Sequence, residues 1–129
     1  MMLKFSFEKL VRDKIVERIA DGGRPSFRKL EKDEHKERLV EKIAEEAQEI
    51  LTARPEEVAS EIADVQQALD DLRELLGVGA EEVSKAQASK NEKYGPFRLG
   101  LYVECVEVGE NDTWVEYYRN NADRYPEIT

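Results

Sequence analysis

Two helical patterns follow one another in this chain, and each carries a pair of carboxylates on one face. Glu46 and Glu49 belong to the first pattern and Glu61 and Asp64 to the second, with a short break at 52–55 between them. Residues three apart share a face of an α-helix, so each pair can present both carboxylates to one point. If the break turns the chain into an antiparallel hairpin, Glu46 and Glu61 lie at similar heights above the turn, because each residue rises about 1.5 Å. The sequence therefore predicts a hairpin on which four carboxylates converge.

Such a cluster repels itself unless a cation occupies it, and oxygen-only ligands suit Mg²⁺ or Mn²⁺ better than zinc. The competing interpretation is a solvated acidic face, since Asp and Glu number 29 in 129 residues and chance pairs are common. Projecting the residues around the helix axis at about 100° per residue distinguishes a metal site from a solvated face. Glu46 falls at the edge of one apolar arc, and Glu61 falls inside the other, between Ala68 and Leu72. An unpaired buried carboxylate is costly, so the position of Glu61 favours a metal site.

The chain as a whole is predicted to be mainly helical. Helical periodicity and stop signals predict four helices, at residues 7–20, 33–52, 55–76 and 80–93. Residues 99–108 alternate in the β manner and, with 114–118 after a turn, predict a hairpin. The expected fold is all-α and four-helix bundle-like. Residues 1–97 form its helical part, and residues 98–129 form a β-like extension of the same single domain.

Size and charge restrict the partners of the chain. A length of 129 residues predicts one domain, and 40% hydrophobic with 38% charged residues leaves a thin core. A homodimer or homotetramer is expected, through a helix face that carries Val65, Leu69, Leu72 and Leu76. The net charge of −9 argues against binding along a nucleic-acid backbone, which needs a basic surface. A small nucleotide that arrives with Mg²⁺ is still compatible with this acidity.

Two features predict a cytoplasmic protein without a membrane partner. Residues 1–7 lack an apolar region of signal-peptide length, and no stretch approaches a membrane span. Cys105 stands alone, so no intrachain disulfide can form, which is typical of a reducing compartment.

Several motifs together resemble one family. They are Lys-Leu-Val-Arg-Asp-Lys-Ile at 9–15, Glu-Glu-Ala-Gln-Glu at 45–49, Glu-Ile-Ala-Asp at 61–64, and Lys90 followed by Gly95 and Phe97. This series, over about residues 8–97, resembles the MazG-like branch of the all-α nucleoside triphosphate pyrophosphatases. That superfamily also includes phosphoribosyl-ATP pyrophosphohydrolase. The opening motif narrows the resemblance to a small single-domain subgroup.

The resemblance implies a helical bundle that oligomerises, binds Mg²⁺ and cleaves a nucleotide between its α and β phosphates. Carried over to this chain, the implied metal ligands are Glu46, Glu49, Glu61 and Asp64, with Glu45 as a neighbouring support or base. Glu45 and Glu46 are therefore the expected catalytic residues. Metal-assisted hydrolysis fits this set, because a carboxylate outside the metal shell can accept a proton from the attacking water.

The phosphates would need cationic partners, and four residues are candidates for substrate binding: Arg12, Lys14, Lys90 and Lys93. An ordinary exposed helix charge is the alternative for each, and it is the favoured interpretation for Lys93. The chain also departs from the subgroup, which commonly has Arg-Gly-Gly-Phe where residues 94–97 read Tyr-Gly-Pro-Phe, and its tail beyond Leu101 is longer.

Three functions remain open at the level of the sequence. The first is a house-cleaning nucleoside triphosphate pyrophosphohydrolase that removes non-standard nucleotides. The second is phosphoribosyl-ATP pyrophosphohydrolase of histidine biosynthesis, which performs the same chemistry on another substrate. The third is a non-catalytic helical dimerisation or regulatory module, which would bind no Mg²⁺.

Overall fold

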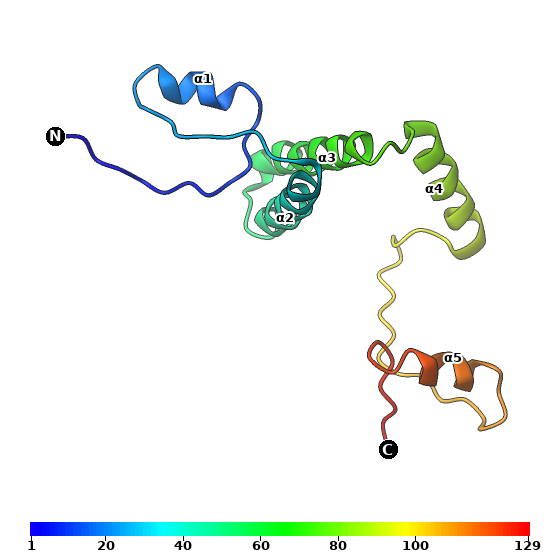
Figure 1. Ribbon diagram of the computed structural model, residues 1–129. Helices are drawn as coiled ribbons and strands as arrows, with labels where there is room; N and C mark the ends of the chain where they lie inside the picture. The colour runs from blue at the N-terminus through cyan, green and yellow to red at the C-terminus, as the bar shows by residue number, and fades with distance from the viewer. The chain divides into compact units, whose positions relative to one another are not determined.

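The computed structural model describes all 129 residues, and all of its regular elements are helical (Figure 1). The chain divides into two units, Met1–Glu92 and Lys93–Thr129. In chain order the elements are α1 (Ile15–Ala20), α2 (Lys32–Ile50), a 3₁₀ turn η1 (Pro55–Glu57), α3 (Val58–Leu75), α4 (Ala80–Tyr94) and α5 (Trp114–Asn120). The all-α prediction is confirmed, and the helices are compatible with a bundle-like fold. No helix combines the length and apolar character needed to cross a membrane.

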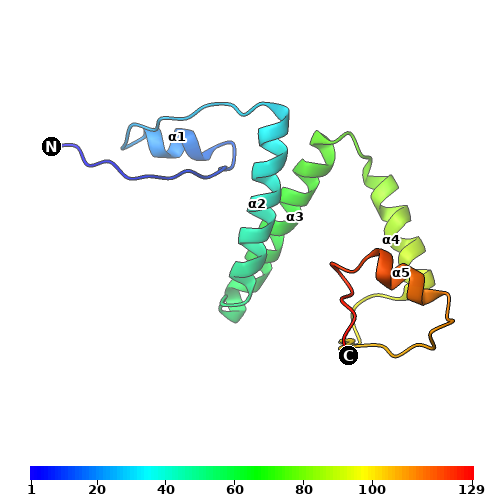
Figure 2. The same cartoon turned by 60° about the horizontal axis from the view of Figure 1, so that its bottom comes forward.

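The packed part of the first unit is the hairpin of α2 and α3, which lie side by side in both views (Figures 1 and 2). Leu39 of α2 and Ala68 of α3 are its buried residues. Asp33 and Glu34 lie in the first turn of α2, where negative charge is favourable at a helix N-terminus. Pro55 then opens the 3₁₀ turn, because a first-turn proline lacks only an N–H that would have no helical partner.

The end of α3 shows how local chemistry stops a helix. Gly77 takes a φ of +70°, which side chains with a Cβ rarely adopt. The N–H of Gly77 donates to the carbonyl of Glu74 at 3.1 Å, and that of Val78 donates to the carbonyl of Arg73 at 3.0 Å. These two bonds satisfy carbonyls that the helix leaves unpaired. The predicted stop at this glycine is confirmed to within one residue.

The prediction of a helix over 7–20 is wrong for its first half, since α1 begins only at Ile15. Glu8 has a φ of +45°, which interrupts any helix through this segment. Phe7 is exposed, so an amphipathic helix here would have little apolar surface to bury, and most helical stability in proteins comes from such packing. Lys9 and Arg12 instead extend to the α2–α3 hairpin.

The predicted C-terminal hairpin is also wrong, because residues 99–108 form no strand and Trp114 begins α5. Trp114, Tyr117 and Tyr118 follow the spacing i, i+3, i+4 of a helix face, and their rings contact one another. Asp112 supports the helix start by accepting a hydrogen bond from the Trp114 N–H at 2.9 Å. A lone alternating segment with no paired strand lacks the hydrogen bonds that would stabilise it.

Candidate metal centre

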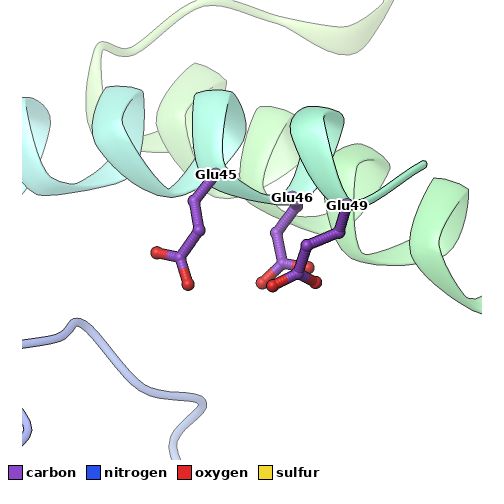
Figure 3. Close-up of side chains that lie close together, drawn as sticks. All are labelled: Glu45, Glu46 and Glu49. Atoms are coloured by element: carbon purple, nitrogen blue, oxygen red, sulfur yellow. The ribbon is translucent and has the colours of Figure 1, made fainter. Parts of the chain in front are cut away.

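The α2–α3 hairpin brings the predicted acids together in two overlapping groups. Glu46, Glu61 and Asp64 each offer a carboxylate oxygen, and these oxygens lie within 4.8 Å of one another. Glu45, Glu46 and Glu49 form a second group of the same kind. The carboxylates of this second group leave α2 on one side, with those of Glu46 and Glu49 next to each other (Figure 3). Glu46 belongs to both groups and therefore links the two helices.

The acids of the first group are partly removed from water. The Glu46 side chain is only 13% exposed. One carboxylate oxygen of Glu61, Oε2, is buried and has no hydrogen-bond partner. Because buried polar atoms in folded proteins are nearly always paired, this atom requires an explanation. A cation bound by the three carboxylates would supply the missing partner.

Mutual repulsion and burial shift the protonation of the cluster. Burial, followed by contact with the carboxylates of Glu49 and Asp64, raises the pKa of Glu46 to about 7, against a smaller opposing effect of Lys42. Contact with the Glu49 carboxylate, together with burial, also raises the pKa of Glu61. The folded cluster therefore favours added positive charge, in the form of protons or of a metal ion.

Three cations border these acids. Lys42 Nζ lies 3.6 Å from Glu45 Oε2 and 3.7 Å from Glu46 Oε1, and Lys9 Nζ lies 3.4 Å from Glu45 Oε1. Arg12 Nη2 donates to Asp64 Oδ1 at 2.6 Å. The sequence analysis missed Lys9 and Lys42. The spacing of Lys42, three and four residues before the two acids on one helix, was a signal that could have found it.

The four predicted substrate-binding cations are placed differently from one another. Arg12 reaches the acid cluster. Lys14 is the N-cap residue of α1. Lys90 lies on α4 and makes no ion pair. Lys93 belongs to the second unit, where its Nζ lies 5.1 Å from the centre of the Tyr94 ring.

The residues present fit a hard divalent cation. All donors are carboxylate oxygens, which Mg²⁺ and Mn²⁺ prefer, and they come from two helices that pack against each other. The unpaired Oε2 of Glu61 lies within this donor set. Glu46, Glu61 and Asp64 would hold the ion, with Glu49 as a further ligand from the second group, which shares Glu46.

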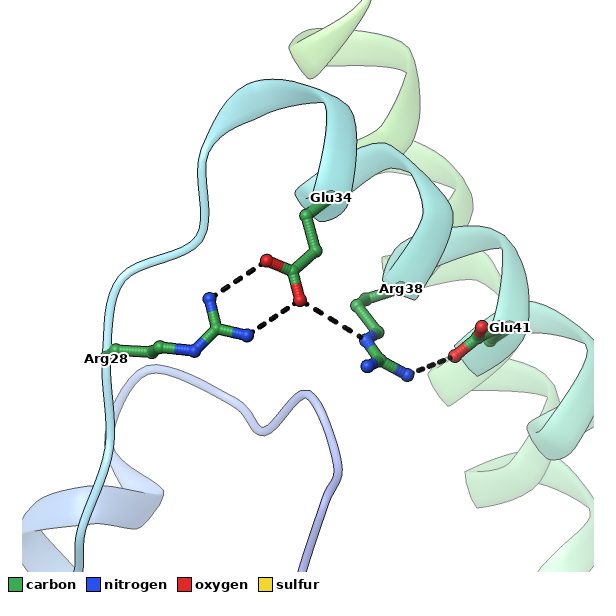
Figure 4. A network of polar contacts seen from close by, with 4 residues as sticks. All are labelled: Arg28, Glu34, Arg38 and Glu41. Atoms are coloured by element: carbon green, nitrogen blue, oxygen red, sulfur yellow. Dashed lines mark hydrogen bonds and ion pairs between the residues drawn. The ribbon is translucent and has the colours of Figure 1, made fainter.

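A second network of charges lies elsewhere on α2 and is structural. Arg28 donates to both carboxylate oxygens of Glu34, at 2.9 and 2.7 Å, and Arg38 bridges Glu34 and Glu41 (Figure 4). The hydrogen bond from Arg28 lowers the pKa of Glu34. This network attaches the connector before α2 to the first turns of that helix, and none of its acids belongs to the clusters above.

Glu46 is expected to give the protein in EDTA a distinct pH dependence. The ordinary pKa of its carboxyl is 4.5, and the folded protein raises it to about 7, so the folded state binds this proton more tightly than the unfolded chain. The contribution of Glu46 to stability is thus greatest below the unfolded pKa and is lost as the pH rises through the folded pKa. The loss should be on the order of 1–3 kcal/mol, measured by urea unfolding across that interval.

Two amide variants with the same net charge test this prediction, one as the test and one as its control. Glu46→Gln should reduce the slope of the profile in this interval, because one of the two acids with a raised pKa is gone. Glu37→Gln, which removes an exposed acid of the same helix, should leave the slope unchanged. A Glu46→Gln profile parallel to that of the parent would contradict the assignment.

Comparison of the chain with protein-family models, curated proteins and solved structures gives no match. The resemblance carried by the opening motif and the two acidic motifs stays a prediction. The function proposed below is supported by the arrangement of the acids and cations on the α2–α3 hairpin.

Proposed function

We propose that this protein is a Mg²⁺-dependent nucleoside triphosphate pyrophosphohydrolase, which converts a nucleoside triphosphate to the monophosphate and pyrophosphate and removes non-standard nucleotides. The observation that carries the proposal is the unpaired buried Oε2 of Glu61 within the group of Glu46, Glu61 and Asp64. These acids belong to the two motifs that resemble the metal-binding motifs of the family.

The chemistry divides between the ion and the protein. Bound Mg²⁺ would neutralise charge on the phosphate oxygens and activate water. Glu45 is the proposed base: the family resemblance gives this position a supporting or basic role, and Glu45 lies next to Glu46 in the group on α2. Lys9, Arg12 and Lys42 surround these acids and supply positive charge for the leaving pyrophosphate.

The proposed assembly is a homodimer or homotetramer. Only Leu39 and Ala68 are buried among the apolar residues, while Val40 is 50%, Leu69 48% and Leu76 41% exposed. A groove of about 510 Å³ between α3 and the start of α4 is lined in part by Leu69, Leu76 and Val83. Uncovered apolar area of this kind marks an interaction surface. Sedimentation at micromolar concentration should show a dimer or tetramer, and a strict monomer would contradict the proposal.

The products of the reaction test the proposed function. With Mg²⁺, a panel of standard and modified nucleoside triphosphates should yield monophosphate and pyrophosphate in equal amounts, with no orthophosphate, and EDTA should stop the reaction. Phosphoribosyl-ATP belongs in the same panel, because its preferred turnover would indicate the histidine-pathway activity. Release of orthophosphate would contradict the proposal. Absence of both turnover and Mg²⁺ binding would favour the non-catalytic module.

A further inference from the structure

The segment before α1 reaches the acid cluster through two cationic side chains. Arg12 Nη2 lies 2.6 Å from Asp64 Oδ1 on α3, and Lys9 Nζ lies 3.4 Å from Glu45 Oε1 on α2. In Figure 3 the N-terminal ribbon, drawn in blue, passes on the side toward which the carboxylates of α2 point. Leu10 and Val11, between these two cations, are half-buried. The segment therefore joins the two helices of the hairpin at the proposed metal centre.

The contact between Arg12 and Asp64 restricts what the carboxylate can bind. Asp64 is one of the three acids that converge from both helices. A carboxylate oxygen that accepts a short, charge-assisted hydrogen bond from a guanidinium has less electron density to offer a metal ion. The two side chains are 59% and 34% exposed, so water screens the pair and a stronger cation can replace it.

Once separated from Asp64, the guanidinium of Arg12 would remain beside the centre. Arginine binds phosphate through paired N–H donors, and its planar geometry matches two phosphate oxygens as well as it matches a carboxylate. The charge of Arg12 is permanent, so the exchange of partners needs no change in protonation.

We propose that Arg12 is an exchangeable positioning residue, which pairs with Asp64 until a divalent cation takes that carboxylate and then turns to the phosphates of the nucleotide. The inference rests on the proposed function and deepens it, because it couples metal binding to substrate binding through one side chain of the N-terminal segment. It implies that Arg12 weakens the binding of the metal alone and strengthens the binding of the nucleotide with metal.

These opposite effects are measurable without turnover. Calorimetric titration of the full chain with Mg²⁺ alone should show about two- to fivefold tighter binding to Arg12→Gln than to the parent, as expected when a competing exposed ion pair is removed. Titration with a nonhydrolysable triphosphate in saturating Mg²⁺ should show weaker binding to the same variant. If Arg12 only stabilised the fold, its replacement would weaken both the binding of Mg²⁺ and the binding of the nucleotide.

Arg28→Gln is the matched control. Arg28 also lies outside the helices and holds one carboxylate, that of Glu34, in an exposed pair, but it is remote from the acid cluster. The substitution changes the net charge by the same amount and should leave both affinities at the parental values. A similar gain in Mg²⁺ affinity in Arg28→Gln would show a general charge effect and overturn the inference.

The side-chain NMR signal of Arg12 in the parent gives a second readout that no variant can disturb. Mg²⁺ should shift the Nε–Hε signal of Arg12, and the triphosphate should shift it again. Mg²⁺ binding with an unmoved Arg12 signal, or weaker Mg²⁺ binding in Arg12→Gln, would overturn this inference alone. Absence of Mg²⁺ binding in the parent would overturn the proposed function together with it.

Discussion

Replacement of Asp64 by alanine should lower the rate of pyrophosphate release by about 10²–10³-fold, the range seen when one electrostatic group that stabilises a transition state is removed. Asp64 is the α3 acid that completes the group with Glu46 and Glu61. Without Asp64, the site holds less firmly the ion that would offset the charge on the phosphates. Glu49→Ala should have a comparable effect, since Glu49 completes the second group on α2. The measurement is the initial rate at saturating nucleotide and Mg²⁺.

Two further variants test whether the fall in the rate of pyrophosphate release is specific to the acids of the metal centre. Asp70→Ala removes an exposed acid further along the same helix and should keep the parental rate. Lys14→Ala should keep partial activity, because Lys14 is only one of several candidate cations for the phosphates and three others border the acids. Circular dichroism would show that the inactive variants keep their helices. An unchanged rate in Asp64→Ala would contradict the assigned metal centre.

Glu61→Gln should separate folding from metal binding. In EDTA the variant should melt at or above the temperature of the parent, because it removes a negative charge from a self-repelling cluster and replaces the unpaired Oε2 with a group of similar volume. In the presence of Mg²⁺ the order should reverse, since the parent gains stability from the bound ion and the variant has lost a ligand. Mg²⁺ affinity should fall on the order of tenfold or more.

Thermal melting in EDTA and in Mg²⁺, together with calorimetric titration, measures both effects. Glu37→Gln is the control of equal charge on an exposed part of α2, and it should change neither the melting temperature in EDTA nor the Mg²⁺ affinity. If Glu61→Gln melted well below the parent in EDTA and bound Mg²⁺ normally, Glu61 would be a structural residue. The assignment of the metal centre would then be wrong.

The features that the sequence predicted well are those that depend on neighbours along the chain. The turn chemistry at Pro55 and Gly77 and the apolar periodicity define α2 and α3 to within a few residues. The spacing of Glu61 relative to Ala68 identified a carboxylate on an apolar face, and its Oε2 is buried. The predictions failed where an element lacked a packing partner, as in the first half of the helix expected over 7–20 and in the hairpin expected near Trp114.

The sequence by itself determined the helical character of residues 1–97, the α2–α3 hairpin and the acids that could converge on it, because helical periodicity and capping act over three or four residues. Only the tertiary structure decided which cations meet those acids. Arg12 and Asp64 are 52 residues apart, and no local rule pairs them. The pKa of Glu46 likewise depends on burial and on Asp64 of the neighbouring helix. Both effects arise from electrostatic interactions through space, which exist only once the folded chain has brought these groups together.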